Sequence, residues 1–227
     1  MKQHKLEYIE KLNIINVKPE FVVIWLHGLG ADYNDFVPIV SQLKINKCLK
    51  FIFPNAPYRK ITVNNDMEMR AWYDIRDLNK LGDTVDREGI LTSVHQIEDL
   101  IESLIKDGWA SDKIFVCGFS QGGVIAYTTA LMTKYKLAGI MALSSYCPDI
   151  EALVKVTVIN KSTPILACHG KQDTVVPYNA GLMAYSALRG AGYNITWTHY
   201  AMEHGVCTEE IQDMSYWLKD RFVDNIT

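Results

Sequence analysis

The chain has 227 residues, of which 48% are apolar and 22% charged, and its formal net charge is −3. This composition excludes a disordered chain, a collagen-like repeat and a disulfide scaffold. A charge balance this close to neutral gives no general attraction to a phosphate backbone, so nucleic acid is not an expected partner. Because no repeat or Pro/Ser-rich linker divides the chain, we expect one domain over residues 1–227.

The first residues and the cysteines predict a cytoplasmic location. Charged residues are scattered through positions 1–10 with no continuous apolar stretch after them, so no secretory signal is expected. A membrane span needs about 18 apolar residues in succession, and no window approaches this, so stable membrane insertion is not expected. The five cysteines are widely spread, with no Cys-x-x-Cys pair. This argues against disulfides and a structural zinc, and predicts small buried thiols in a cytoplasmic protein.

Short runs of β-branched and aromatic residues predict the strands. The first five runs are apolar throughout, which is typical of strands covered on both faces of a parallel sheet. The run at 194–200 alternates instead, which favours a place near a sheet edge. The five apolar runs cover residues 21–26, 51–53, 113–117, 139–143 and 164–168.

Helical patterns fall between these runs. Apolar residues at steps of three and four over 90–104 predict one face of a long helix that Gly108 ends, and 121–134, 178–189 and 207–221 also suit helices. Strands alternating with helices predict an α/β protein with a doubly wound, mostly parallel sheet and helices on both faces. Ligands bind such sheets beyond the carboxyl ends of the strands, so we expect the functional residues there.

A Gly-x-Ser-x-Gly pattern follows the third of these strands, at Gly118-Phe-Ser-Gln-Gly122. The strand before it and the helix after it give the pattern its meaning, because a sharp strained turn then lifts the serine Oγ clear of the sheet. Glycine is expected on both sides because a Cβ there would clash with the neighbouring strand and helix. The alternative is a chance turn capping a helix. The context favours Ser120 as a nucleophile.

The first strong strand ends in His27-Gly28-Leu29-Gly30. Glycines there let the backbone approach a substrate, so the N–H groups of Leu29 and Gln121 are predicted to form an oxyanion hole. His27 precedes the nucleophile in the chain and is expected to brace the loop by hydrogen bonding. A dinucleotide fingerprint does not fit, because its third glycine and the later acidic residue are missing.

The acid and the base are predicted from chain order, which in this architecture runs Ser, Asp or Glu, His. Asp173 follows the strand at 164–168, and His204 follows the strand at 194–200. His204 would take the Ser120 proton while Asp173 fixes its tautomer. Two rivals are weaker, since the side chain of Glu203 would point away from its neighbour and His169 precedes Asp173 too closely to be its partner.

With these residues in place, the sequence resembles the acyl-protein thioesterase and carboxylesterase family of α/β-hydrolases over about residues 21–218. The resemblance implies the α/β-hydrolase fold and hydrolysis of acyl esters or thioesters through an acyl-serine, with no cofactor and no metal. It rests on six segments in order: 25–32, 53–57, 69–74, 118–123, 169–173 with 176–177, and the segment around His204.

The resemblance also implies an acyl pocket. Carried over, its positions give Val63, Tyr146 and Val175, with Trp72 supporting the loop. Ordinary core residues are the alternative for all four. Acyl length would be set by the loops at 58–85 and 145–163, whose conformation does not follow from their residues.

The leading functional hypothesis is a serine esterase or thioesterase acting on small acyl substrates, acylated proteins or lysophospholipids in lipid metabolism. A catalytically inactive binding module on the same fold is one alternative, and a serine peptidase-like hydrolase is another. A dienelactone-type hydrolase would carry Cys at position 120. The residues specify no oligomeric state.

Overall fold

The computed structural model describes residues 6–77, 84–156 and 158–222. Its main sheet has seven strands in the order β1-β3-β2-β6-β7-β8-β9. Only the β1–β3 pair is antiparallel, and every other neighbouring pair is parallel. The strands are β1 (Tyr8–Leu12), β2 (Phe21–Leu26), β3 (Leu49–Pro54), β6 (Ile114–Phe119), β7 (Gly139–Leu143), β8 (Ile165–Gly170) and β9 (Ile195–Tyr200).

The five apolar runs form β2, β3, β6, β7 and β8, which are buried almost throughout, as predicted. The alternating run forms β9 and lies at one edge, which is also confirmed. At the opposite edge, β1 was not predicted because its residues are mostly charged or half-exposed. A second sheet, the antiparallel hairpin of β4 (Tyr58–Ile61) and β5 (Met67–Arg70), was likewise not predicted.

The predicted helices are confirmed to within a few residues. The long helix is α2, and Gly108 follows it with φ of +97°, so its N–H and that of Trp109 can close the last turn onto the carbonyls of Ile105 and Leu104. The helices are α1 (Ile39–Gln42), α2 (Arg87–Lys106), α3 (Gln121–Met132), α4 (Ile150–Leu153), α5 (Tyr178–Gly190) and α6 (Thr208–Lys219), with short 3-10 turns at Thr62–Asn64 and Ser111–Lys113.

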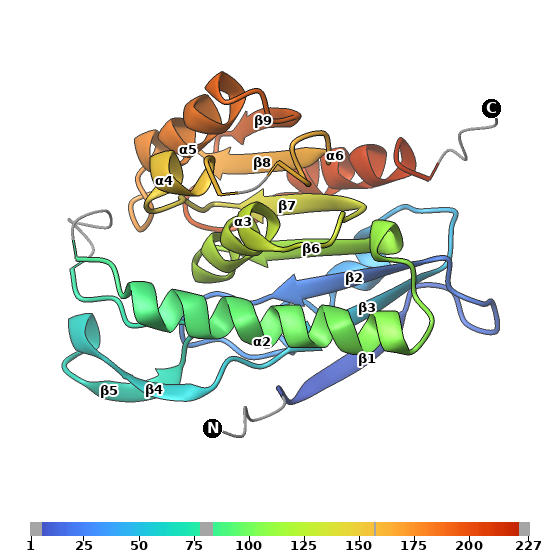
Figure 1. Ribbon diagram of the computed structural model, residues 1–227, viewed down its shortest axis with the longest axis horizontal. Helices are drawn as coiled ribbons and strands as arrows, with labels where there is room; N and C mark the ends of the chain where they lie inside the picture. The colour runs from blue at the N-terminus through green and yellow to red at the C-terminus, as the bar shows by residue number, and fades with distance from the viewer. Residues whose placement is uncertain (1–5, 78–83, 157, 223–227) are drawn as a thin grey trace.

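Apolar side chains cover both faces of the sheet, as expected of a doubly wound fold. One cluster joins alternate residues of the strands to α2, α3 and α5, and the other joins the remaining strand residues to α1 and α6. Figure 1 shows α2 and α3 in front of the sheet and the β4–β5 hairpin beside the start of α2. Across the described ranges, no helix has the combined length and hydrophobicity of a membrane span.

Candidate active site

Ser120 lies in the sharp turn between α3 and β6, the central strand of the sheet. Its backbone has φ of 52° and ψ of −117°, a strained conformation for a residue with a side chain that costs about 1–3 kcal/mol. A Cβ on Gly118 would clash with the carbonyl of Gly122, and one on Gly122 would clash with the carbonyl of Leu26 at the end of β2. The glycines are therefore required by close backbone approach, as predicted.

Three side chains from separate strand ends meet at this turn. Ser120 Oγ lies 2.9 Å from His204 Nε2, and His204 Nδ1 lies 2.7 Å from Asp173 Oδ2. Because a carboxylate only accepts hydrogen bonds, Nδ1 carries the proton, and Nε2 is left to accept the bond from the Ser120 hydroxyl. The ring of Phe119 packs on the imidazole at a centroid distance of 4.8 Å. The structure thus brings the three predicted residues together.

Asp173 is held on both carboxylate oxygens. Its side chain is fully buried, Oδ1 accepts the backbone N–H groups of Val175 (2.9 Å) and Val176 (2.8 Å), and Oδ2 faces His204. Glu203, the rival acid, is exposed. His169, the rival base, is also buried and its Nε2 lies 3.4 Å from Asp173 Oδ2. The expectation that His169 precedes Asp173 too closely to meet it is therefore wrong, although it is His204 and not His169 that contacts Ser120 Oγ.

The loop after β2 lies against Ser120, as the oxyanion-hole prediction requires. A Cβ built on Gly28 would be 3.6 Å from the Ser120 Cβ. In the described part of the chain, neither predicted donor, the N–H of Leu29 or of Gln121, is bonded to another residue. His27 braces this loop, because its Nδ1–H donates to the Gly28 carbonyl (2.7 Å) and its Nε2 accepts the Ala56 N–H (3.0 Å). Burial lowers the pKa of His27, which keeps this tautomer neutral.

The Gln121 side chain forms two hydrogen bonds that the sequence did not predict. Its Oε1 accepts the Trp72 N–H (2.8 Å), and its Nε2 donates to the Tyr73 carbonyl (2.7 Å). The Trp72 indole N–H donates to the His27 carbonyl (2.9 Å), and the Ser93 hydroxyl donates to the Trp72 carbonyl. Trp72 therefore ties the segment after β5 to the turn of the nucleophile and to the loop after β2.

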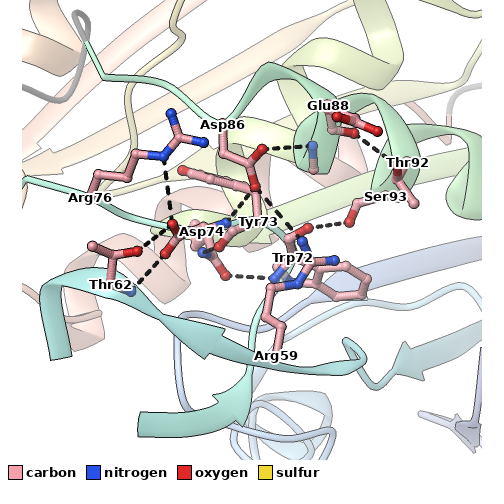
Figure 2. Close-up of polar contacts among 12 residues, drawn as sticks. Arg59, Thr62, Trp72, Tyr73, Asp74, Arg76, Asp86, Glu88, Thr92 and Ser93 are labelled. Atoms are coloured by element: carbon pink, nitrogen blue, oxygen red, sulfur yellow. Dashed lines mark hydrogen bonds and ion pairs between the residues drawn. The ribbon is translucent and has the colours of Figure 1, made fainter. Parts of the chain in front are cut away.

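Two aspartates anchor the same segment, as Figure 2 shows. Asp74 accepts hydrogen bonds from the backbone N–H (2.8 Å) and the hydroxyl (2.7 Å) of Thr62. Asp86 caps α2 by accepting the Gly89 N–H (3.0 Å), and its other oxygen accepts the Asp74 N–H (2.9 Å). The Arg59 guanidinium of β4 lies 3.9 Å from that same oxygen. Asp86 thus joins the hairpin, the Trp72 segment and α2.

Asp86→Asn is expected to destabilise the fold by about 1–3 kcal/mol, because whichever way the amide turns, one N–H donor of Gly89 or Asp74 then faces an NH2 group. Urea unfolding measures this loss. Asp99→Asn, on an exposed position of α2, is the matched control and should stay within about 0.5 kcal/mol of the parent. Equal midpoints for the two variants would contradict the role given to Asp86.

The residues predicted to line an acyl pocket are spread around the same end of the sheet. Val63 is half-buried and its N–H donates to the Ile75 carbonyl (2.9 Å). The buried Tyr146 hydroxyl lies 2.9 Å from that of Tyr73, and Tyr146 also lines a groove of 660 Å³ between α4 and α5. Val175 is 42% exposed. Substrate contact by these residues stays a prediction.

Two other predictions concern cysteines and metals. Four of the five cysteines are buried, and none forms a disulfide, whereas Cys207 is only half-buried. Within residues 6–77, 84–156 and 158–222, His, Cys, Asp and Glu side chains form no group of three or more that could hold a metal ion.

Comparison with known proteins identifies the family of the chain. Residues 11–221 match the family model described as Phospholipase/Carboxylesterase. Acyl-protein thioesterase 1 of Neurospora crassa is 40% identical over 210 residues, which are 88% of this chain and 86% of that protein. Carboxylesterase SOBER1 of Arabidopsis thaliana is 31% identical over 204 residues, 88% of this chain and 90% of the relative.

Solved structures lead to the same fold. The crystal structure of Arabidopsis thaliana SOBER1 has a TM-score of 0.84 at 30% identity, covering 89% of this chain and 99% of the other. Zea mays acyl-protein thioesterase 2 shares the fold, with a TM-score of 0.81 at 24% identity over 94% of this chain and 98% of the other. The chain has the α/β-hydrolase fold and belongs to the phospholipase/carboxylesterase family.

Proposed function

We propose that the chain is a serine hydrolase that cleaves ester or thioester bonds of acyl substrates through an acyl intermediate on Ser120. The observation that carries the proposal is the continuous hydrogen-bonded chain from Ser120 Oγ to His204 (2.9 Å) and from His204 to Asp173 (2.7 Å). Relatives named acyl-protein thioesterase and carboxylesterase support the substrate class.

Each step follows from the position of one group. His204 Nε2 accepts the hydroxyl proton as Ser120 Oγ attacks the acyl carbonyl, and Asp173 stabilises the imidazolium that forms. The N–H groups of Leu29 and Gln121 bind the oxyanion, assisted by the positive end of the α3 dipole. His204 then protonates the leaving alcohol or thiol. A water molecule then attacks the acyl carbon and gives its proton to the same Nε2. The bond from the acyl carbon to Ser120 Oγ breaks, His204 returns the proton to Oγ, and the acid leaves.

The substrate class includes small acyl esters and thioesters, with acylated proteins and lysophospholipids as larger candidates. Val63, Tyr146 and Val175 would contact the acyl chain, and Trp72 would support the loop through its bond to the His27 carbonyl. Five unpaired cysteines, four of them buried, support a cytoplasmic site of action. A role in lipid metabolism is supported by the relatives named acyl-protein thioesterase and carboxylesterase.

A labelling experiment tests the proposal together with turnover. The purified protein is expected to hydrolyse p-nitrophenyl esters and matched acyl-thioesters, compared over graded chain lengths, and to react with a fluorophosphonate probe. Peptide mass spectrometry should then locate the phosphonyl group on Ser120, since the adjacent base activates that hydroxyl. A protein that binds acyl chains without being labelled would instead be a binding module, and cleavage of peptide amides in preference to esters would favour the peptidase-like alternative.

A further inference from the structure

A second buried histidine lies against the carboxylate of the proposed triad. His169 is in β8, and its side chain is fully buried beside that of Asp173. Asp173 Oδ2 lies 2.7 Å from His204 Nδ1 and 3.4 Å from His169 Nε2. His204 is accounted for by the proposed chemistry, whereas His169 is not.

The contacts of His169 define its tautomer. Nε2 lies 2.9 Å from the Val176 carbonyl, which only accepts, so Nε2 carries the proton. Nδ1 is buried and has no hydrogen-bond partner in the described ranges. Gly181 of α5 packs directly on Nδ1, where a Cβ would clash. A second proton would create a buried N–H with no acceptor, and burial lowers the pKa of His169 accordingly.

The ring is fixed from two sides. The Trp197 indole of β9 stacks on it at a centroid distance of 5.9 Å, with an interplanar angle of 29°. The Tyr178 ring at the start of α5 meets it edge-on at 6.0 Å. An imidazole held in this way presents its Nε2–H in one direction only, toward the turn that carries Asp173.

The Val176 peptide group connects this ring to the triad. Its carbonyl accepts the His169 Nε2–H at 2.9 Å, and its N–H donates to Asp173 Oδ1 at 2.8 Å. The His169 ring therefore fixes the Val176 peptide group, and that peptide group in turn fixes the Asp173 carboxylate. The His169 Nε2–H also lies near Asp173 Oδ2, at 3.4 Å between the heavy atoms.

We propose that His169 is a positioning residue: a constantly neutral imidazole whose Nε2–H fixes the 173–176 turn, so that Asp173 presents Oδ2 to His204. Because the ring carries no charge, His169 does not neutralise Asp173, and the carboxylate keeps its full negative charge for the shorter bond to His204. The titratable groups that face the ring are Asp173, His204 and Tyr178. The inference rests on the proposed function.

Two amide variants test the position of the donor. His169→Gln places an N–H near the original Nε2, whereas His169→Asn places it near Nδ1, with similar polarity. The Asn variant is expected to lose about 10- to 100-fold in kcat on a short p-nitrophenyl ester with KM unchanged, the range for one hydrogen bond at a charged pair. The Gln variant should recover most of that loss. Equal kcat values for the two variants, or a change confined to KM, would overturn the proposal.

A spectroscopic measurement separates this inference from the proposed function, since it needs no turnover. In ¹⁵N-histidine-labelled protein, the His169 signal is identified among the six histidines by its loss in His169→Gln. It is expected to report the neutral Nε2–H form throughout about pH 5 to 8, where ordinary histidines titrate. The downfield proton of the His204–Asp173 bond should persist in His169→Gln and weaken in His169→Asn. Titration of His169 in that range, or the Nδ1–H tautomer, would refute the inference even if the enzyme is active.

Discussion

Ser120→Ala is expected to lower kcat by about 10⁶-fold on an activated ester while leaving the fold intact. In the proposed mechanism the Oγ forms the acyl intermediate, and without it only the slower direct attack of water on the bound ester remains. Stability should change little, because alanine keeps the same strained backbone and the serine side chain makes no hydrogen bond that caps α3. Hydrolysis of p-nitrophenyl butyrate measures the loss, and circular dichroism checks the fold.

The three residues should behave as one unit. His204→Ala is expected to cost about as much as Ser120→Ala, and the double variant no more than either, whereas Asp173→Asn should cost about 10⁴-fold. Residual activity in Ser120→Ala within tenfold of the parent would place the nucleophile elsewhere. Effects that add in the double variant would show that the two side chains act in separate steps.

Much of the fold could be predicted because its central strands are buried on both faces. The apolar run at 113–117 and the glycines at 118 and 122 leave few other ways to place the turn of Ser120. Strand β1 could not be predicted in this way. It is a half-exposed edge strand in which pairing with β3 and an ion pair from Glu10 to Lys50 (2.7 Å) replace an apolar pattern.

The candidate site also contains residues that the sequence predicts and contacts that it does not. Ser120, Asp173 and His204 could be predicted because each is identified by the strand that it follows, without knowledge of the side chains around it. The side-chain bonds of Gln121 to the Trp72 segment were not, because they join positions 48 and 49 residues apart through backbone atoms that carry no sequence signal. The bond between the His169 ring and the Val176 carbonyl joins positions only seven residues apart, but it too ends on a backbone atom.

Glu210 offers a test of electrostatics next to the site. It is in the first turn of α6, and its side chain is completely buried. Neither oxygen has a hydrogen bond of good geometry among the described residues, and the Cys207 backbone and the Cys168 thiol interact with it only loosely. Burial raises the pKa of Glu210 to about 8, the charge of Asp213 adds to this, and the nearby Cys207 backbone and Cys168 thiol offset part of it. The folded protein therefore holds a proton here that the unfolded chain, with an ordinary pKa near 4.5, releases.

The sign of the linkage follows from this raised value. Below about pH 4.5 both states are protonated, and between there and about pH 8 only the folded state keeps the proton, so the free energy of unfolding falls as pH rises. The loss is complete above about pH 8 and amounts to at most about 5 kcal/mol at 1.36 kcal/mol per pKa unit. Glu210→Gln removes the titration. Its stability relative to the parent is expected to rise by that amount between about pH 5 and 8.

Urea unfolding at a series of pH values measures the difference between Glu210→Gln and the parent. Burying the extra amide N–H groups costs about 1–3 kcal/mol, but this cost is independent of pH. The test is therefore how the difference in unfolding free energy changes with pH, and not its value at one pH. Glu209→Gln, an exposed neighbour in the same turn, should follow the parent at every pH. Parallel curves for Glu210→Gln and the parent would mean that Glu210 titrates normally in the fold. α6 begins at Thr208, shortly after His204, so the pH-dependent loss of stability at Glu210 falls on the element that follows the proposed base. Inactivation of the parent should therefore accelerate toward alkaline pH, and Glu210→Gln should resist it.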